Sequence, residues 1–237
     1  MSVHDYYARY WLRADPELAT EATTLRMRQT LILDALRRYG MLGSPSRVLD
    51  AGCGAGEFLR FFAEREFEVY GIDLVQEALE RAQQLCPGAS LHLGSLEEPL
   101  PFSSGFFDVV WCTEVLEHLF LPASALKEFH RVLKAGGLLI VTTPYHGFLK
   151  NLAVLSFGFE RHFDVTGAHI RFFTKRSLVC SLTASGFKVM AARGLGRVWP
   201  VYKSVLVVAR KPWEPTAGDG EPERHCDLTS RAVAGSR

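Results

Sequence analysis

The stretch Val48-Leu49-Asp50-Ala51-Gly52-Cys53-Gly54-Ala55-Gly56 decides the fold. An apolar run leads directly into three alternating glycines, and a helical pattern opens at Glu57. Glycines in a strand-to-helix turn permit a tight bend and let a ligand approach bare backbone N–H groups, while the helix start adds partial positive charge. The stretch therefore indicates an α/β ligand-binding turn, although a lone glycine-rich loop is also compatible with a simple tight turn.

Short apolar runs and helical stretches alternate along the chain on both sides of this turn. Strands are predicted at Arg47–Asp50, Val69–Asp73, Ser90–Leu93, Phe107–Cys112, Leu138–Thr143, Phe187–Ala191 and Ser204–Ala209. Helical spacing occupies Phe58–Glu66, Val75–Leu85, Ala123–Leu133 and a segment that Thr174 can cap. This alternation predicts a seven-stranded, mostly parallel sheet with helices on both faces, and the last two strands are expected to form an antiparallel pair at its edge.

Composition divides the chain into three regions. Residues 1–45 are expected to form an N-terminal helical cap, and residues 46–211 the main domain, with an insertion at 145–173 after the fifth strand. Residues 212–237 are rich in Pro, Gly, Glu, Arg and Ser, which predicts a disordered tail. The 237 residues are 48% hydrophobic and 22% charged, enough to build a core without disulfides or a structural metal.

Net charge and hydropathy indicate which class of partner and which cellular location to expect. The net charge of +1 and the lack of a Lys/Arg-rich arm argue against a nucleic-acid partner. No apolar run approaches the roughly 18 residues of a membrane span, and no leader precedes the first helix. We therefore expect a cytoplasmic protein; the sequence leaves its oligomeric state open.

Two acidic residues indicate what the glycine turn binds. Asp73 ends the next predicted strand, about 20 residues past Gly52, where a carboxylate can accept hydrogen bonds from both hydroxyls of a ribose. The alternative role for Asp73 is a helix N-cap. Asp50 stands where a pyrophosphate would otherwise arrive, which favours a cationic or zwitterionic ligand over a dinucleotide.

The segments Val48–Phe58, Gly71–Leu74, Gly94–Phe102, Phe107–His118 and Leu133–Pro144 together resemble class I S-adenosylmethionine-dependent methyltransferases. Within that class the chain is most similar to the small-molecule branch that includes ubiquinone-pathway O-methyltransferases. The resemblance implies a Rossmann-like fold and S-adenosylmethionine as cofactor. The implied cofactor-binding residues are Asp50, Gly52, Cys53, Gly54, Gly56, Asp73, Leu74, Ser95, Leu96, Thr113 and Glu114.

Roles within this set follow from the same resemblance. The glycines would surround the methionine part and Asp73 would hold the ribose. Ser95 and Leu96 would lie beside the adenine, and Thr113 and Glu114 would line the mouth. The family usually carries Asp where this chain has Ser95, so the contact to the adenine amine loses charge assistance.

The sequence Glu114-Val115-Leu116-Glu117-His118 adds a second group of reactive side chains. If a helix begins there, both carboxylates and the imidazole share one face and could bind a divalent ion. The resemblance implies the same role for this pattern, with His169 completing the site. The alternatives are a packing role for the motif and, without metal, general-base catalysis by His118 or His169.

The insertion after the fifth strand is where parallel-sheet proteins bind substrates. Its apolar residues are expected to wall an acceptor pocket, with a packed lid as the alternative; they are Phe148, Leu149, Leu152, Val154, Leu155, Phe157, Phe159 and Phe163. This lining favours an apolar or aromatic acceptor. Lys150, Arg161 and Arg171 could instead recognise an anionic group.

The sequence therefore predicts methyl transfer from S-adenosylmethionine to a small molecule, with a hydroxyl oxygen as the favoured acceptor. N- or C-methylation and a catalytically silent cofactor-binding partner remain as alternatives. An NAD-dependent oxidoreductase would need the third glycine one position later, and a nucleic-acid methyltransferase would need a basic surface.

Overall fold

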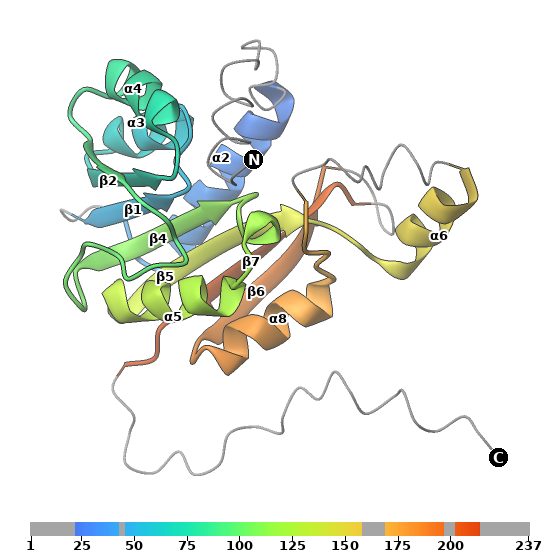
Figure 1. Cartoon of the computed structure of the whole chain (residues 1–237). Helices are drawn as coiled ribbons and strands as arrows, with labels where there is room; N and C mark the ends of the chain where they lie inside the picture. Colours follow the sequence, from blue (N-terminus) through green and yellow to red (C-terminus); the bar gives the residue numbers. More distant parts are fainter. Residues whose placement is uncertain (1–21, 43–45, 158–168, 197–201, 214–237) are drawn as a thin grey trace.

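A computed structural model of the whole chain describes residues 22–42, 46–157, 169–196 and 202–213. Its seven strands form one sheet in the order β3-β2-β1-β4-β5-β7-β6 (Figure 1). They are β1 (Arg47–Ala51), β2 (Glu68–Asp73), β3 (Ser90–Leu93), β4 (Phe107–Thr113), β5 (Leu133–Pro144), β6 (Lys188–Leu195) and β7 (Ser204–Arg210). Strands β1 to β5 are parallel, and β7 lies antiparallel to both β5 and β6. The predicted mostly parallel sheet and its antiparallel strand pair are confirmed.

Helices cover both faces of the sheet (Figure 1). One face packs against α2 (Ala22–Arg38), α3 (Glu57–Ala63) and α4 (Gln76–Leu85), and the other against α5 (Pro122–Val132) and α8 (Lys175–Ala184). Helix α6 (Phe148–Phe157) follows β5 and projects away from the sheet. None of the helices in the described parts of the chain combines the length and the apolar character that crossing a membrane requires.

Side-chain alternation along the strands divides the core into two layers. Val48 and Trp111 face the layer under α2 and α3, whereas Leu49 and Val110 face the layer under α5 and α8. All four side chains are fully buried, because a central parallel strand has a helix layer on each face. This explains why β1 and β4 consist of nearly continuous apolar residues.

The predicted cap of α8 is confirmed. The Thr174 hydroxyl accepts a hydrogen bond from the Ser177 N–H at 3.0 Å, and the Ser177 hydroxyl accepts one from the Thr174 N–H at 2.9 Å. This reciprocal capping box satisfies two donors at the start of the helix. Helix α8 therefore begins at Lys175 and turns Leu178 and Leu182 into the core.

The strand order places a topological switch point between β1 and β4. From β1 the chain continues outward to β2 and β3, and it then returns to the other side of β1 as β4. Ligands of open α/β sheets bind outside the carboxyl ends of the strands at such a point. Here those ends carry Asp50 to Gly52 on one side and Thr113 to Glu114 on the other.

Several sequence predictions lie outside the described residues. They include the first part of the N-terminal cap, residues 158–168 of the insertion, and residues 214–237 of the tail. At the predicted start of the tail the description continues to Trp213, whose ring lies over Gly136. The three-part division of the chain stays a prediction.

Candidate cofactor site at the switch point

The glycine turn is held in a form that only glycine adopts easily. Gly52, Gly54 and Gly56 have φ angles of 79°, 52° and 91°, all in the left-handed region. A Cβ atom on Gly52 would lie 2.5 Å from Cγ2 of Val115, and one on Gly56 would lie 3.0 Å from the backbone of Ala82. The sequence spacing therefore reflects both backbone conformation and close packing at this turn.

Asp73 fastens the turn to β2. Its Oδ2 accepts the Gly54 N–H at 2.9 Å, and its Oδ1 accepts the Val75 N–H at 3.0 Å. The N-cap alternative is wrong, because the N-cap of α4 is Val75 and no side chain caps that helix; the second bond instead holds the turn that leads into α4. Each carboxylate oxygen keeps a second lone pair, so the side chain can still accept bonds from a ribose.

Asp50 is almost completely buried, and neither of its carboxylate oxygens has a hydrogen-bond partner among the described residues. Burial raises the pKa of Asp50 well above its usual value, and the nearby Asp73 and Glu57 raise it further. A buried carboxylate without a partner is costly unless a ligand supplies a donor or a positive charge. A cationic group beside the glycine turn would supply the partner that Asp50 lacks among the described residues.

The remaining predicted cofactor residues surround the turn. Cys53 is buried, and burial raises the pKa of its thiol, which makes it a small apolar group and no nucleophile. Leu74 is half-buried beside Asp73, and Leu96 is buried in the core. The Ser95 hydroxyl accepts the Glu97 N–H at 3.1 Å, so it stabilises its own loop.

A network of polar side chains crosses the mouth of the site. The Thr113 hydroxyl lies 2.7 Å from that of Thr142, which donates to Oε1 of Glu114 at 2.9 Å. The same oxygen of Glu114 lies 3.0 Å from Nη2 of Arg28 on α2. Arg28 is 6% exposed, and its Nε has no hydrogen-bond partner among the described residues. Thr113 and Glu114 thus both belong to this network, in which Glu114 turns to α2.

Arg28 was not among the residues predicted for this site. A signal was present, because Arg28 shares one stripe of α2 with Ile32, Ala35 and Leu36, all of which are buried. A charged residue on a buried stripe is uncommon and indicates a partner or a function.

The helix expected at the Glu114–His118 motif is only a single 3₁₀ turn, η2 (Leu116–His118). Glu114 precedes it with φ at 51°, so its side chain leaves the face that Glu117 and His118 share. The turn instead brings Glu117 and His118 together with His169, and one potential ligand atom from each lies within 4.8 Å of the others. The structure thus assembles three of the four predicted metal-binding residues.

Backbone bonds hold His169 against this turn. The N–H groups of Ile170 and Arg171 both donate to the Glu117 carbonyl at 3.0 Å. The rings of His118 and His169 lie 4.9 Å apart. His169 is exposed as a residue, yet the partial burial of its ring lowers its pKa; Lys150 lowers it further, and Glu114 opposes the shift.

Glu117 is the buried member of this cluster. Its carboxylate lies 3.9 Å from Nε2 of His118, and neither of its oxygens accepts a hydrogen bond from a described residue. Burial raises the pKa of Glu117 well above its usual value, and Glu114 raises it further. A buried carboxylate beside two imidazoles can take a proton or a metal ion.

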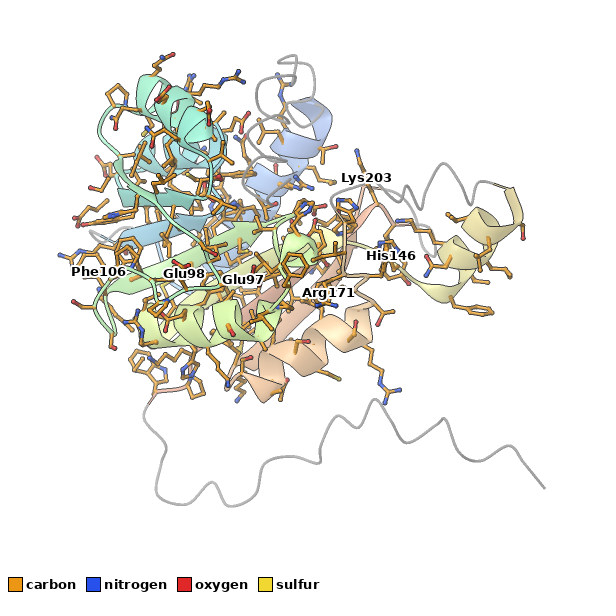
Figure 2. All side chains as sticks on the ribbon, viewed as in Figure 1. Glu97, Glu98, Phe106, His146, Arg171 and Lys203 are labelled. Carbon is orange, nitrogen blue, oxygen red and sulfur yellow. The ribbon has the colours of Figure 1, made fainter. Side chains whose placement is uncertain are left out.

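The loop after η2 forms a fixed apolar rim at the mouth. Arg171, labelled in Figure 2, donates to the Phe120 carbonyl at 2.7 Å, and Glu97 accepts the Leu121 N–H. Phe120 and Leu121 are nevertheless exposed. Since both backbone groups are held by charged side chains, the two apolar residues are presented to solvent in a defined position.

The pocket expected from the insertion is not closed in the described part of the chain. Phe148 is 79% exposed, and Leu149, Leu152 and Leu155 are also exposed on α6. Phe159 and Phe163 lie outside the described residues. Lys150 instead turns back to the sheet, where its ammonium donates to the Tyr145 carbonyl at 2.6 Å.

Comparison with known proteins agrees with this geometry. Residues 49–141 match the methyltransferase domain family. A ubiquinone biosynthesis O-methyltransferase from Pseudomonas aeruginosa (strain LESB58) is 37% identical over 110 residues, covering 45% of this chain and 47% of that protein. A malonyl-[acyl-carrier protein] O-methyltransferase from Pseudescherichia vulneris is 34% identical over 108 residues, covering 46% and 43%. The matches thus span less than half the length of these relatives.

Solved structures show the same fold. The N-methyltransferase NodS from Bradyrhizobium japonicum WM9, solved with S-adenosyl-l-homocysteine, superposes with a TM-score of 0.67 at 19% identity, covering 88% of this chain and 98% of that one. At this identity the likeness supports the fold alone. The domain match makes residues 49–141 similar to a methyltransferase domain, and the strand order and the glycine turn agree with that similarity.

Proposed function

We propose that this protein transfers the methyl group of S-adenosylmethionine to a hydroxyl oxygen of a small molecule. The observation that carries the proposal is a pair of buried, oppositely charged side chains at the switch point whose hydrogen bonding is incomplete. Asp50 has a buried carboxylate without a hydrogen-bond partner among the described residues, and Arg28 has a buried Nε without one. Burying both is costly unless a ligand carries an ammonium and a carboxylate. The methionine part of the cofactor has this combination.

The other residues fit the rest of the cofactor. The left-handed glycines leave the turn bare for close approach, and Asp73 keeps lone pairs for two ribose hydroxyls. Leu96 and the loop of Ser95 are assigned to the adenine. When bound, the cofactor supplies a methyl group that its sulfonium already activates, so the protein has mainly to hold the acceptor oxygen in line about 3 Å away.

His169 is assigned as the base that takes the acceptor proton. Its ring lies at the mouth against His118, and its lowered pKa keeps it neutral at neutral pH. The acceptor O–H bond breaks as His169 takes the proton, the new C–O bond forms, and the methyl–sulfur bond breaks to leave S-adenosylhomocysteine. His118 orients the His169 ring, and a half-buried and an exposed imidazole in contact at this place argue against a catalytically silent partner.

A divalent metal ion is the second candidate for the same step. Glu117, His118 and His169 would hold it, and the unsatisfied Glu117 oxygens support such a site. The ion would lower the pKa of the acceptor hydroxyl. Glu114 would not contribute while it pairs with Arg28. Turnover that survives EDTA assigns the step to His169 alone, whereas loss with EDTA and recovery with Mg²⁺ assign it to the ion.

The acceptor is proposed to be apolar or aromatic, because Phe120 and Leu121 form a fixed rim beside the His118–His169 pair. Oxygen is favoured over nitrogen because the sequence relatives above are O-methyltransferases. N-methylation remains as a second outcome, since the superposed NodS structure is an N-methyltransferase.

Calorimetric titration with S-adenosylhomocysteine tests the cofactor assignment. One-site binding in the micromolar range to the metal-free protein supports the proposal. A folded protein that binds neither S-adenosylhomocysteine nor S-adenosylmethionine contradicts it. Incubation with catechols, phenols and the matching anilines, using methyl-labelled cofactor, then tests whether the label moves to oxygen or to nitrogen.

A further inference from the structure

Glu114 has an unusual backbone for its residue type. Its φ of 51° lies in the left-handed region, which costs a non-glycine residue free energy, and it comes directly after β4 at the switch point. Backbone strain of this kind persists only where surrounding contacts enforce it, and it is often found at functional sites. The contacts made by the Glu114 side chain are therefore informative.

Three bonds hold Glu114 in this conformation. Its N–H donates to the Thr142 carbonyl at 2.9 Å, and the Thr142 hydroxyl donates to Oε1 at 2.9 Å. Arg28 then meets the same Oε1 at 3.0 Å. Since Thr142 is completely buried in β5, the carboxylate has a rigid support. The left-handed backbone thus serves to direct the carboxylate from the sheet toward α2.

The ion pair leaves Arg28 with unused hydrogen-bonding capacity. A guanidinium has five N–H donors in a fixed plane, and fixing one nitrogen fixes the direction of the others. Nη2 is held by Glu114, whereas Nε is buried without a partner among the described residues. The arginine is therefore ready to receive a second carboxylate.

We infer that Glu114 is a positioning residue, and that its ion pair holds Arg28 in the orientation that receives the cofactor carboxylate. The inference rests on the proposed function. It differs from the sequence prediction, in which Glu114 itself contacts the cofactor or a metal ion. In the alternative, Glu114 only ties α2 to the sheet and contributes to stability.

Two ligands separate these roles. S-adenosylhomocysteine has the amino-acid part that Arg28 would bind, and 5′-methylthioadenosine lacks it. A residue that acts through Arg28 changes the affinity for the first ligand only. A residue that merely stabilises the fold weakens the binding of both. The ratio of the two dissociation constants, measured by calorimetry, is therefore the readout.

In Arg28→Met we expect at least a tenfold loss of S-adenosylhomocysteine affinity, because a charge-assisted bond is lost, and at most about a twofold change for 5′-methylthioadenosine. Glu114→Gln should lose S-adenosylhomocysteine affinity roughly three- to tenfold, again with at most about a twofold change for 5′-methylthioadenosine. Glu114→Gly removes the carboxylate and also the strain of the left-handed backbone. Its affinities for the two ligands should match those of Glu114→Gln. Asp34→Asn removes an exposed acid from α2 and should bind both ligands as the wild type does.

The double variant gives the sharpest test. If Glu114 acts through Arg28, adding Glu114→Gln to Arg28→Met should change S-adenosylhomocysteine affinity by less than about twofold. Additive losses would overturn the inference, as would equal losses for both ligands in Glu114→Gln. If the wild type binds neither ligand, the proposed function itself fails. If the wild type binds S-adenosylhomocysteine more tightly than 5′-methylthioadenosine but the variants show additive or equal losses, only the positioning role of Glu114 fails.

Discussion

At the scale of single residues, three charged side chains near the ends of β1 and β4 bury polar atoms that no described residue satisfies. They are Arg28, Asp50 and Glu117. Each would lower the stability of the ligand-free protein, because buried unpaired polar groups cost about 1–3 kcal/mol or more. They belong to α2, to β1 and to the turn after β4, all near the switch point, so a single binding event can satisfy several of them.

Asp73→Ala should weaken S-adenosylhomocysteine binding at least about tenfold, because it removes the acceptor assigned to the ribose and frees the Gly54 N–H that it holds. Asp73→Asn keeps one acceptor oxygen, so its affinity for S-adenosylhomocysteine should lie between that of Asp73→Ala and that of the wild type. Calorimetry gives the affinities. Binding by Asp73→Ala that matches the wild type would show that Asp73 serves only to hold the glycine turn and the residues before α4.

His169→Ala should reduce turnover by about 100-fold or more, as expected for loss of a general base, and leave S-adenosylhomocysteine affinity nearly unchanged. Steady-state rates with an acceptor that the wild type methylates give the turnover, and calorimetry on the same preparation gives the affinity. His92→Ala, on β3 against Phe102, is the matched control and should retain turnover. Equal losses of rate and cofactor affinity in His169→Ala would exclude a role confined to the acceptor.

At the scale of elements, the start of α8 depends on the Thr174–Ser177 capping box. Thr174→Ala should lower the free energy of unfolding by about 1 kcal/mol, whereas Thr174→Ser keeps the hydroxyl and should stay close to the wild type. Urea denaturation measures both variants. If the two are equally stable, the cap bonds do not contribute to the folded state.

The loop between β3 and β4 is fastened to α5. Glu128 accepts the Leu100 N–H at 2.7 Å, and Arg131 bonds both to Glu128 and to the carbonyls of Leu100 and Phe102. This loop carries Ser95 and Leu96, the residues assigned to the adenine. The α5 pair therefore positions one wall of the site.

The hydrogen bonds from Arg131 hold the pKa of Glu128 below its usual 4.5. The folded state thus binds this proton less tightly than the unfolded chain, so the stabilisation is present above pH 4.5 and is lost as pH falls through the lower, folded pKa. Glu128→Gln should cost about 1 kcal/mol at pH 7, and its difference from wild type should shrink below pH 4.5. Urea unfolding at pH 7 and pH 3.5 measures this, with Glu98→Gln on the exposed loop as control.

Most elements were predictable from sequence because their signals are local. Short apolar runs mark β1 and β4, three glycines mark the turn, and Thr174 marks the start of α8. The helix considered after Glu114 forms only as a 3₁₀ turn, because tertiary contacts determine the backbone there. Glu114 takes a left-handed backbone to meet Thr142 and Arg28, and neither partner is near it in sequence.

At the scale of the whole molecule, the site joins residues that are far apart along the chain. Asp73 and the glycine turn have a recognisable spacing, so their meeting could be predicted. Arg28 comes from α2, and His169 is brought to η2 by the backbone bonds of the two residues after it and by the contact of its ring with His118. A single sequence carries no distance information for such contacts, which is why Arg28 was missed.

The C-terminal side of the domain closes over the start of β5. Lys211 exchanges backbone bonds with Gly136 and Gly137, its ammonium donates to the Leu133 carbonyl, and Trp213 covers Gly136.

A chain that ends at Trp213 should unfold at the same urea concentration as the full chain. One that ends at Arg210 should lose about 2–3 kcal/mol, because three hydrogen bonds disappear. Equal stability of the two truncated chains would contradict this assignment.

The position of β7 between β5 and β6 in the sheet has a consequence for protein synthesis. During translation β5 leaves the ribosome with β4 already available on one side, whereas its other partner follows only about 60 residues later. At about 5–20 residues per second, that side of a largely apolar strand stays open for several seconds. Unpaired strand edges of this kind recruit other chains. Recovery of the protein from expressing cells should therefore depend on elongation speed and on chaperones that shield the nascent β5.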